Sequence, residues 1–238
     1  MGVKDRRTEW FVPSVGPLKL RIFIGLLFLP YTGMVLAYTV IGSMLADSVH
    51  WDRVGAILVI YFLALGVGAH ALDALGSSGV KPWGKVFSKW QLWALAISSM
   101  VAAYAIGIYY MVLYTPLLWL IAILEGFFVF AYNLEWFRGR FHTDAWFAVS
   151  WGSLPVLAGY ILQTNRISAA ALLVAASMGL LSLVEIKASR PYKGMKRASG
   201  DIGGTERAHI EQFESILKGL SLGVILLGAG MASLRWLG

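Results

Sequence analysis

Long apolar runs, separated by short polar or basic segments, extend along nearly the whole chain. Most of these runs approach or exceed the roughly 20 residues that a helix needs to cross the hydrocarbon core of a bilayer. Proline interrupts a helix, so Thr115-Pro116 separates the third run from the fourth. The pattern predicts an all-α, polytopic transmembrane helix bundle of about seven spans, at residues 20–45, 54–75, 92–110, 114–133, 145–162, 167–186 and 216–236.

The composition agrees with a membrane protein. Hydrophobic residues make up 58% of the chain and charged residues 14%, whereas a soluble domain has roughly 45–50% and 25%. We therefore expect one integral-membrane helical domain over residues 1–238, with a polar amino tail at 1–19 and a long polar connection at 187–213. The acidic end of that connection, residues 206–214, could form a short amphipathic helix on the membrane surface. The chain contains no cysteine, which excludes disulfides, thiol nucleophiles and Cys-based zinc sites.

The basic residues predict the orientation in the cell membrane. All but three of the 20 Lys and Arg residues lie in the amino tail or near the connections after the second, fourth and sixth spans. Only Arg53, Arg166 and Arg235 lie at the opposite side. Because basic residues accumulate on the cytoplasmic side of membrane proteins, we expect a cytoplasmic amino terminus and an outer carboxyl terminus.

Glu125 lies near the middle of the fourth span. A charged side chain at that depth costs roughly 2.5–3.5 kcal/mol on insertion scales, so we expect it to face the bundle interior and to be paired or protonated. Tyr132 follows seven residues later, on the same face of the helix.

A second group of polar residues lies near the ends of four predicted spans, at one common depth. His70 and Asp73 are three residues apart and therefore share one face of a helix. The group is His70, Asp73, Asn133, Glu135, Asp144 and Glu185. These residues are either ordinary interfacial polar groups or the parts of a cytoplasmic site.

Three stretches of the chain resemble the UbiA-type integral-membrane prenyltransferases. The stretch from Ala69 to Ser77, with His70 and Asp73, corresponds to the family's first acidic motif at the end of the second helix. Tyr132, followed by Arg138 and Arg140, corresponds to a tyrosine and basic residues after the fourth helix. The run Glu185-Ile-Lys-Ala-Ser-Arg190 corresponds to the second acidic motif. The resemblance extends over about residues 19–197 and rests on order and spacing more than on identities.

The resemblance implies a bundle that transfers a prenyl chain from a prenyl diphosphate to an acceptor, here unknown. It implies that Asp73 and Glu185 hold Mg2+, that His70 assists them, and that their carboxylates face each other across a cytoplasmic cavity. The diphosphate or another isoprenoid head group would contact Arg138, Arg140, Lys193, Tyr132 and Asn133, with Lys81, Lys85, Lys196 and Arg197 nearby. In the first motif, however, Ala69, His70 and Ser77 stand where the family has other residues, and the family's nine helices are reduced to seven.

Two other functions remain open. The chain could be a non-catalytic relative that binds an isoprenoid or another membrane lipid, or a small transporter in which Glu125 is the working group. The absence of an obvious inverted repeat weighs against the transporter. No nucleic-acid motif is present. Gly219-x-x-x-Gly223 in the last span predicts close packing between helices.

Overall fold

The computed structural model of the chain describes residues 9–76, 86–197 and 204–238. Their regular structure is helical throughout, without a β-strand. The helices are α1 (Leu18–Leu26), α2 (Leu29–Met44), α3 (Trp51–Tyr61), η2 (Phe62–Ala69), α4 (His70–Gly76), α5 (Lys89–Leu113), α6 (Leu118–Asn133), η3 (Phe137–Gly139), α7 (Asp144–Phe147), η4 (Ala148–Ser153), α8 (Leu154–Thr164), α9 (Ala169–Arg197) and α10 (Gly204–Leu237).

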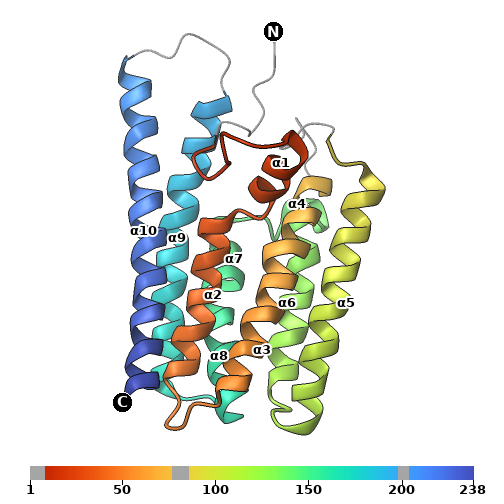
Figure 1. Cartoon of the computed structure of the whole chain (residues 1–238), viewed down its shortest axis with the longest axis vertical. Coiled ribbons are helices and arrows are strands. Elements are labelled where there is room, and N and C mark those ends of the chain that lie inside the picture. The colour runs from red at the N-terminus through yellow and green to blue at the C-terminus, as the bar shows by residue number, and fades with distance from the viewer. Residues whose placement is uncertain (1–8, 77–85, 198–203) are drawn as a thin grey trace.

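The long helices run side by side along the longest axis of the molecule, and the short α1 lies at one end of this bundle (Figure 1). We call this the α1 end. The carboxyl-terminal end of α10 lies at the other end of the bundle, beside the turn between α2 and α3. The predicted break at Thr115-Pro116 is confirmed, since α5 ends at Leu113 and α6 begins at Leu118.

Six helical stretches are long and apolar enough to cross a membrane. They are Leu18–Met44, Trp51–Gly76, Lys89–Leu113, Asp144–Thr164, Ala169–Lys196 and Gly204–Leu237. The apolar helix α6 has 16 residues, which corresponds to a length of about 24 Å at 1.5 Å per residue. With α6 as the seventh and shortest member, the predicted all-helical membrane bundle of about seven spans is confirmed.

Two of the crossing stretches contain a π-helical segment midway. Segment η2 joins α3 to α4, and η4 joins α7 to α8. Such wide turns are rare and often lie next to functional sites. Segment η4 ends just before Pro155, the residue in α8 that has no amide hydrogen to continue the regular hydrogen-bond ladder.

Helices α2 and α8 approach each other closely at two glycines. An added Cβ at Gly159 would lie 2.0 Å from the Thr39 carbonyl oxygen, and one at Gly42 would lie 1.9 Å from the Val156 carbonyl oxygen. The Ser43 hydroxyl donates a hydrogen bond to the Gly159 carbonyl across the same contact, over 3.3 Å. Small residues bring membrane helices this close because apolar side chains gain nothing by leaving lipid for another helix.

The segment 187–213 corrects one prediction, because most of what we expected to be a loop is helical. Helix α9 continues to Arg197, and α10 begins at Gly204, so residues 206–214 form the start of α10 rather than a separate surface helix. Glu214 stabilises this extension by accepting a hydrogen bond from the Tyr192 hydroxyl and pairing with Lys196 and Lys218. Contacts between helices, which local polarity does not reveal, therefore keep the segment helical.

The glycines of α10 correct a second prediction. Neither Gly219 nor Gly223 has a described atom within 4 Å of an added Cβ, so this pair makes no close helix contact within the chain. The closely packed glycine of α10 is Gly228, where an added Cβ would lie 3.0 Å from the Ala37 Cβ of α2. Spacing alone predicted a packing face, but the tertiary structure turns a different face of α10 inward.

Candidate functional site

The carboxyl-terminal ends of α4 and α6 meet at the α1 end of the bundle. Gly76, the last residue of α4, lies against the backbone of Asn133, the last residue of α6: an added Cβ would be 2.1 Å from the Asn133 carbonyl oxygen. A side chain larger than hydrogen at position 76 would push these helix ends apart. This contact brings the helix that carries His70 and Asp73 beside the helix that carries Tyr132.

His142, in the connection between α6 and α7, is fixed on Tyr132. The two rings are stacked, with 4.4 Å between their centroids. The Tyr132 carbonyl accepts a hydrogen bond of 2.9 Å from Nδ1 of His142. Because a carbonyl oxygen can only accept, Nδ1 carries the hydrogen and Nε2 is the nitrogen available for other chemistry.

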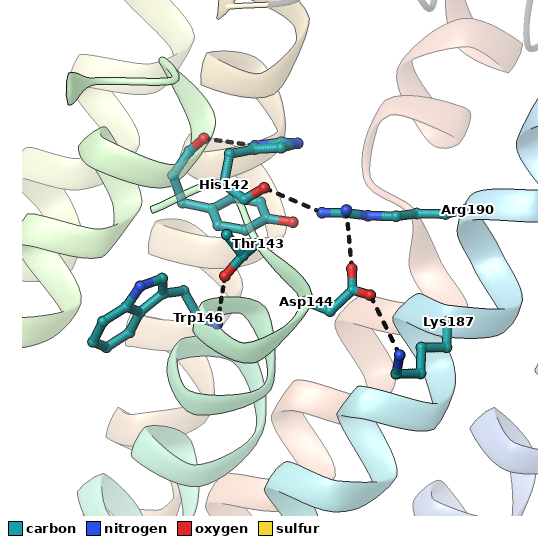
Figure 2. A network of polar contacts seen from close by, with 7 residues as sticks. His142, Thr143, Asp144, Trp146, Lys187 and Arg190 are labelled. Carbon is teal, nitrogen blue, oxygen red and sulfur yellow. Dashed lines mark hydrogen bonds and ion pairs between the residues drawn. The ribbon is translucent and has the colours of Figure 1, made fainter. Parts of the chain in front are cut away.

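Arg190 of α9 connects this unit to α7. Its Nη1 atom is 3.0 Å from Oδ1 of Asp144, and its Nη2 atom donates a hydrogen bond of 3.4 Å to the His142 carbonyl (Figure 2). Lys187, one turn earlier on α9, has its Nζ atom 3.9 Å from Oδ2 of Asp144. Asp144 also lies in the first turn of α7, where the helix dipole favours a negative charge. We call His142, Asp144, Lys187 and Arg190 the Arg190 network.

Tyr132 links the Arg190 network to the first acidic motif. Its side chain is buried, and its electrostatic neighbours are the Arg190 guanidinium and the carboxylates of Asp73 and Asp144. The side chains of Asp73, Tyr132, Asp144 and Arg190 therefore gather at one place, although they come from α4, α6, α7 and α9. Of these four, Asp73 and Asp144 belong to the group for which the sequence predicted a common depth.

His70, the first residue of α4, lies against the junction between α1 and α2. Phe28 forms that junction in a left-handed conformation, with φ 46° and ψ 49°. The Phe28 and His70 rings are stacked with 4.5 Å between centroids, and the Trp151 ring of η4 is 5.3 Å from His70. Nε2 of His70 is 3.4 Å from the Thr32 hydroxyl oxygen. The imidazole thus lies buried among aromatic rings.

The conformation of Phe28 is costly, because a residue with a side chain in a sparsely populated backbone region loses about 1–3 kcal/mol. Packing of its ring on His70 and Phe11 compensates for part of this cost. Such strain is retained where the surrounding structure demands it, and clusters at binding sites.

Lys193 and Glu185 belong to the same end of α9. The Nζ atom of Lys193 lies 5.3 Å from the centre of the Phe28 ring and 5.7 Å from that of Tyr31, within range of a cation–π interaction. Glu185 is buried, and Lys193 is its charged neighbour. Lys193 and His70 both contact the Phe28 ring. Lys193 is the charged neighbour of Glu185, and Asp73 is a charged neighbour of Tyr132, so five of the eight predicted site residues belong to two neighbouring groups.

The other three predicted site residues point elsewhere. Arg138 and Arg140 are exposed, beside the short helix η3. Asn133 is buried, and its side-chain amide donates a hydrogen bond of 2.7 Å to the Val129 carbonyl one turn earlier. These residues make no recorded side-chain contact with the Arg190 network. Ser77, Lys81 and Lys85, which the sequence analysis also named, lie outside the described residues, as does the side chain of Arg197.

The set of possible metal ligands is small. Among residues 9–76, 86–197 and 204–238, no group of three or more His, Asp or Glu side chains is arranged to hold a metal ion. Magnesium in phosphate-transfer sites needs only one or two carboxylates when the phosphate groups of the substrate supply further oxygen ligands. Asp73 and Glu185 are therefore chemically suitable only for an ion that binds together with a phosphate-bearing ligand.

Glu125 occupies a different part of the molecule. It is buried in the middle of α6, and its Oε1 atom accepts a hydrogen bond of 3.0 Å from the Tyr61 hydroxyl of α3. The expectation that this carboxyl group faces the bundle interior and has a partner is confirmed. Its role as the working group of a transporter stays a hypothesis.

The sequence did not single out Phe28, and it placed Arg190 only among the residues that set topology. A signal existed for Arg190, because Lys187 and Arg190 are three residues apart and share the helix face that meets Asp144. No local signal existed for Phe28, an apolar residue inside an apolar run.

A comparison of the chain with protein-family models, with curated proteins and with solved structures found no match.

Proposed function

We propose that the chain is a UbiA-like membrane protein that binds a prenyl diphosphate at the α1 end and transfers its prenyl group to an acceptor. The observation that carries the proposal is the gathering of Arg190, Tyr132 and Asp73 from three separate helices. Together with Lys193 over Phe28, they form a polar and cationic surface at the edge of an apolar bundle. An amphiphile matches this arrangement, because its phosphate head group suits the polar and cationic side chains and its apolar chain suits the bundle.

The chemistry of the side chains suits a diphosphate. The Arg190 guanidinium carries five donors, of which Asp144 and the His142 carbonyl engage only a part, so it can also bind phosphate oxygens. Its side chain is 42% exposed and therefore accessible to a ligand. His142 presents Nε2 to the same region and can move a proton there. The apolar chain of the ligand would extend from the head group toward the bundle and the lipid.

In this proposal, Mg2+ binds together with the diphosphate. Asp73 and Glu185 are the residues that would hold it, and the ion would neutralise charge on the departing diphosphate. Arg190 and Lys193 contribute positive charge whether or not the ion is bound.

Binding without transfer is the second candidate function. The lack of a third His, Asp or Glu ligand among the described residues favours it, because a weakly held ion assists departure poorly. In that case the protein is a non-catalytic isoprenoid or lipid-binding relative that keeps the head-group site.

The proposal includes an orientation, with the α1 end on the cytoplasmic side of the cell membrane. The basic residues of the Arg190 network, Lys193 and Lys196 belong to this end. At the other end, two of the three basic side chains bond to backbone carbonyls. Arg53 donates to those of Leu162 and Gln163, and Arg235 donates to that of Met44. These hydrogen bonds explain the presence of Arg53 and Arg235 at this end. The two arginines therefore do not weaken the asymmetry of Lys and Arg residues between the two ends of the bundle.

A binding and transfer assay tests the function. Purified protein in lipid nanodiscs would be mixed with labelled geranyl, farnesyl and geranylgeranyl diphosphate, Mg2+ and a membrane-lipid extract as the source of acceptor. We expect saturable binding, and a labelled lipid product that Asp73→Asn abolishes while Glu211→Gln, which changes an exposed carboxylate, leaves it intact. Binding without any product would favour the second candidate. Absence of binding at every chain length would reject both functions.

A further inference from the structure

A cavity of about 70 Å3 lies between α3, α5 and α6, with Ala158 of α8 at its base. Its lining is apolar apart from the side chains of Tyr61, Tyr104 and Glu125. Apolar side chains on three helices leave this space partly unfilled, although membrane helices gain stability by packing closely. The cavity lies at the depth of Glu125, about two helical turns from Tyr132 on α6, and shares no residue with the Arg190 network.

One polar atom of a residue that lines the cavity lacks a partner. Oε1 of Glu125 accepts the hydrogen bond from Tyr61, and the Tyr104 hydroxyl donates to the Ala122 carbonyl over 2.9 Å. Oε2 of Glu125 is buried and has no hydrogen-bond partner among the described residues. The whole side chain is only 9% exposed. An unpaired buried polar atom costs about 1–3 kcal/mol, so the arrangement is stabilised by a ligand that bonds to Oε2.

We infer that this cavity is an intramembrane binding site for a lipophilic alcohol, with the hydroxyl group of the ligand bonded to Oε2 of Glu125. A hydroxyl group both donates and accepts, so it can pair with Oε2 in the ionised and in the protonated carboxyl group. A carbonyl oxygen pairs only with the protonated form, and an ammonium group only with the ionised form. The apolar walls suit the carbon chain, because ligand pockets combine apolar lining with a few placed polar groups.

Access to the cavity is from the side of the bundle. Ile60, Ala122 and Gly126 line the cavity and are only half-buried, so its edge reaches the surface that faces lipid. Gly126 leaves room for the Tyr104 side chain at this edge, because an added Cβ would lie 2.2 Å from the Tyr104 hydroxyl oxygen. A volume of about 70 Å3 holds the hydroxyl group and the first few carbons of a ligand. The rest of the chain would extend into the bilayer.

Photolabelling with competition tests the inference. The full-length protein in nanodiscs would be photolabelled with an octanol that carries an aliphatic diazirine, and the labelled residues mapped by mass spectrometry. We expect label on α3, α5 and α6 at the cavity. We also expect 1-octanol to compete about fivefold better than n-octane at equal concentration in the membrane, as one hydrogen bond provides. Equal competition by the two, or stronger competition by octylamine, would overturn the assignment.

Variants distinguish recognition of the ligand's hydroxyl group from binding of the ligand in the cavity. Glu125→Gln keeps a donor and an acceptor at the same place and should retain the fivefold preference for octanol. Glu125→Leu should remove the preference, and Ala103→Leu should remove the cavity label by filling the space. Unchanged labelling in Ala103→Leu would show that the label lies elsewhere. The comparison of octanol with octane on the wild-type protein needs no variant, so the test stands even if one of them folds poorly.

Discussion

Arg190 of α9 and Asp144 at the start of α7 form an ion pair between two helices, with 3.0 Å between Nη1 and Oδ1. Their side chains are 42% and 29% exposed, so water screens much of the attraction. Exposed pairs of this kind contribute about 0–1 kcal/mol to stability. The pair therefore matters more for holding the guanidinium in position than for holding the fold together.

The first prediction concerns ligand affinity. Arg190→Gln should lower the affinity for a prenyl diphosphate about tenfold, because a hydrogen bond to a charged group contributes about 1.5–3 kcal/mol. Stability should fall by less than about 1 kcal/mol. Titration of labelled ligand and denaturant unfolding of the same samples would measure both. Arg166→Gln, which removes an exposed arginine at the other end, is the matched control. A loss of stability without a loss of affinity would make Arg190 a purely structural residue.

The second prediction concerns the pair in the middle of the bundle. Tyr61→Phe removes the donor to Oε1 of Glu125 and leaves both carboxyl oxygens without a described partner. Hydrogen bonds between membrane helices contribute about 0.6 kcal/mol on average, and an unpaired buried group costs more, so we expect a loss of about 1 kcal/mol. Unfolding in mixed micelles measures it. Glu125→Gln keeps an acceptor for Tyr61 and should stay closer to wild type. If Tyr61→Phe were as stable as the wild-type protein, the hydrogen bond between Tyr61 and Glu125 would be contradicted.

The third prediction compares two glycines. Gly159→Ala places a Cβ 2.0 Å from the Thr39 carbonyl oxygen and should destabilise the protein by about 1–3 kcal/mol as α2 and α8 are forced apart. Gly219→Ala meets no atom within 4 Å and should be neutral or stabilising by up to about 1 kcal/mol, because alanine favours the helix. Thermal unfolding of both variants in the same detergent distinguishes them. The reverse order of stability would mean that α2 and α8 do not pack through Gly159.

The fourth prediction concerns orientation and uses the absence of natural cysteine. Ser14 and Ser48 are both exposed and lie toward opposite ends of the bundle, before α1 and after α2. In intact cells, a membrane-impermeant maleimide should label Ser48→Cys, whereas Ser14→Cys should react only after permeabilisation. Labelling in the opposite pattern would place the α1 end outside and reject the proposed cytoplasmic site.

The hydrophobic pattern predicted much of the fold. It predicted a membrane bundle, the break at Thr115-Pro116, and the inward orientation of Glu125. These features depend on the cost of moving each residue into lipid, which is a property of that residue and its immediate neighbours. The same reasoning predicted one depth for Asp73, Asn133 and Glu185, because residues near span ends share a distance from the bilayer centre.

Predictions from the local sequence pattern were wrong where contacts between distant segments determine the structure. Polarity at 187–213 predicted a loop, yet Tyr192 and Glu214 pack together and keep both helices extended. The spacing of Gly219 and Gly223 predicted a packed face, but Gly228 makes that contact. Arg138 and Arg140 were predicted to be site residues because their order along the chain matches a motif. In the structure, Arg190 is the arginine that lies near Tyr132 and pairs with Asp144.

The sequence by itself determined that this chain forms an all-helical membrane bundle of about seven spans and that Glu125 faces its interior. Only the tertiary structure decided that Phe28 stacks on His70, that Arg190 pairs with Asp144, and that Glu125 lines a cavity between α3, α5 and α6. The physical reason is that hydropathy fixes the position of a residue along the membrane normal. The rotation of each helix and its choice of neighbours depend on close packing among all of them.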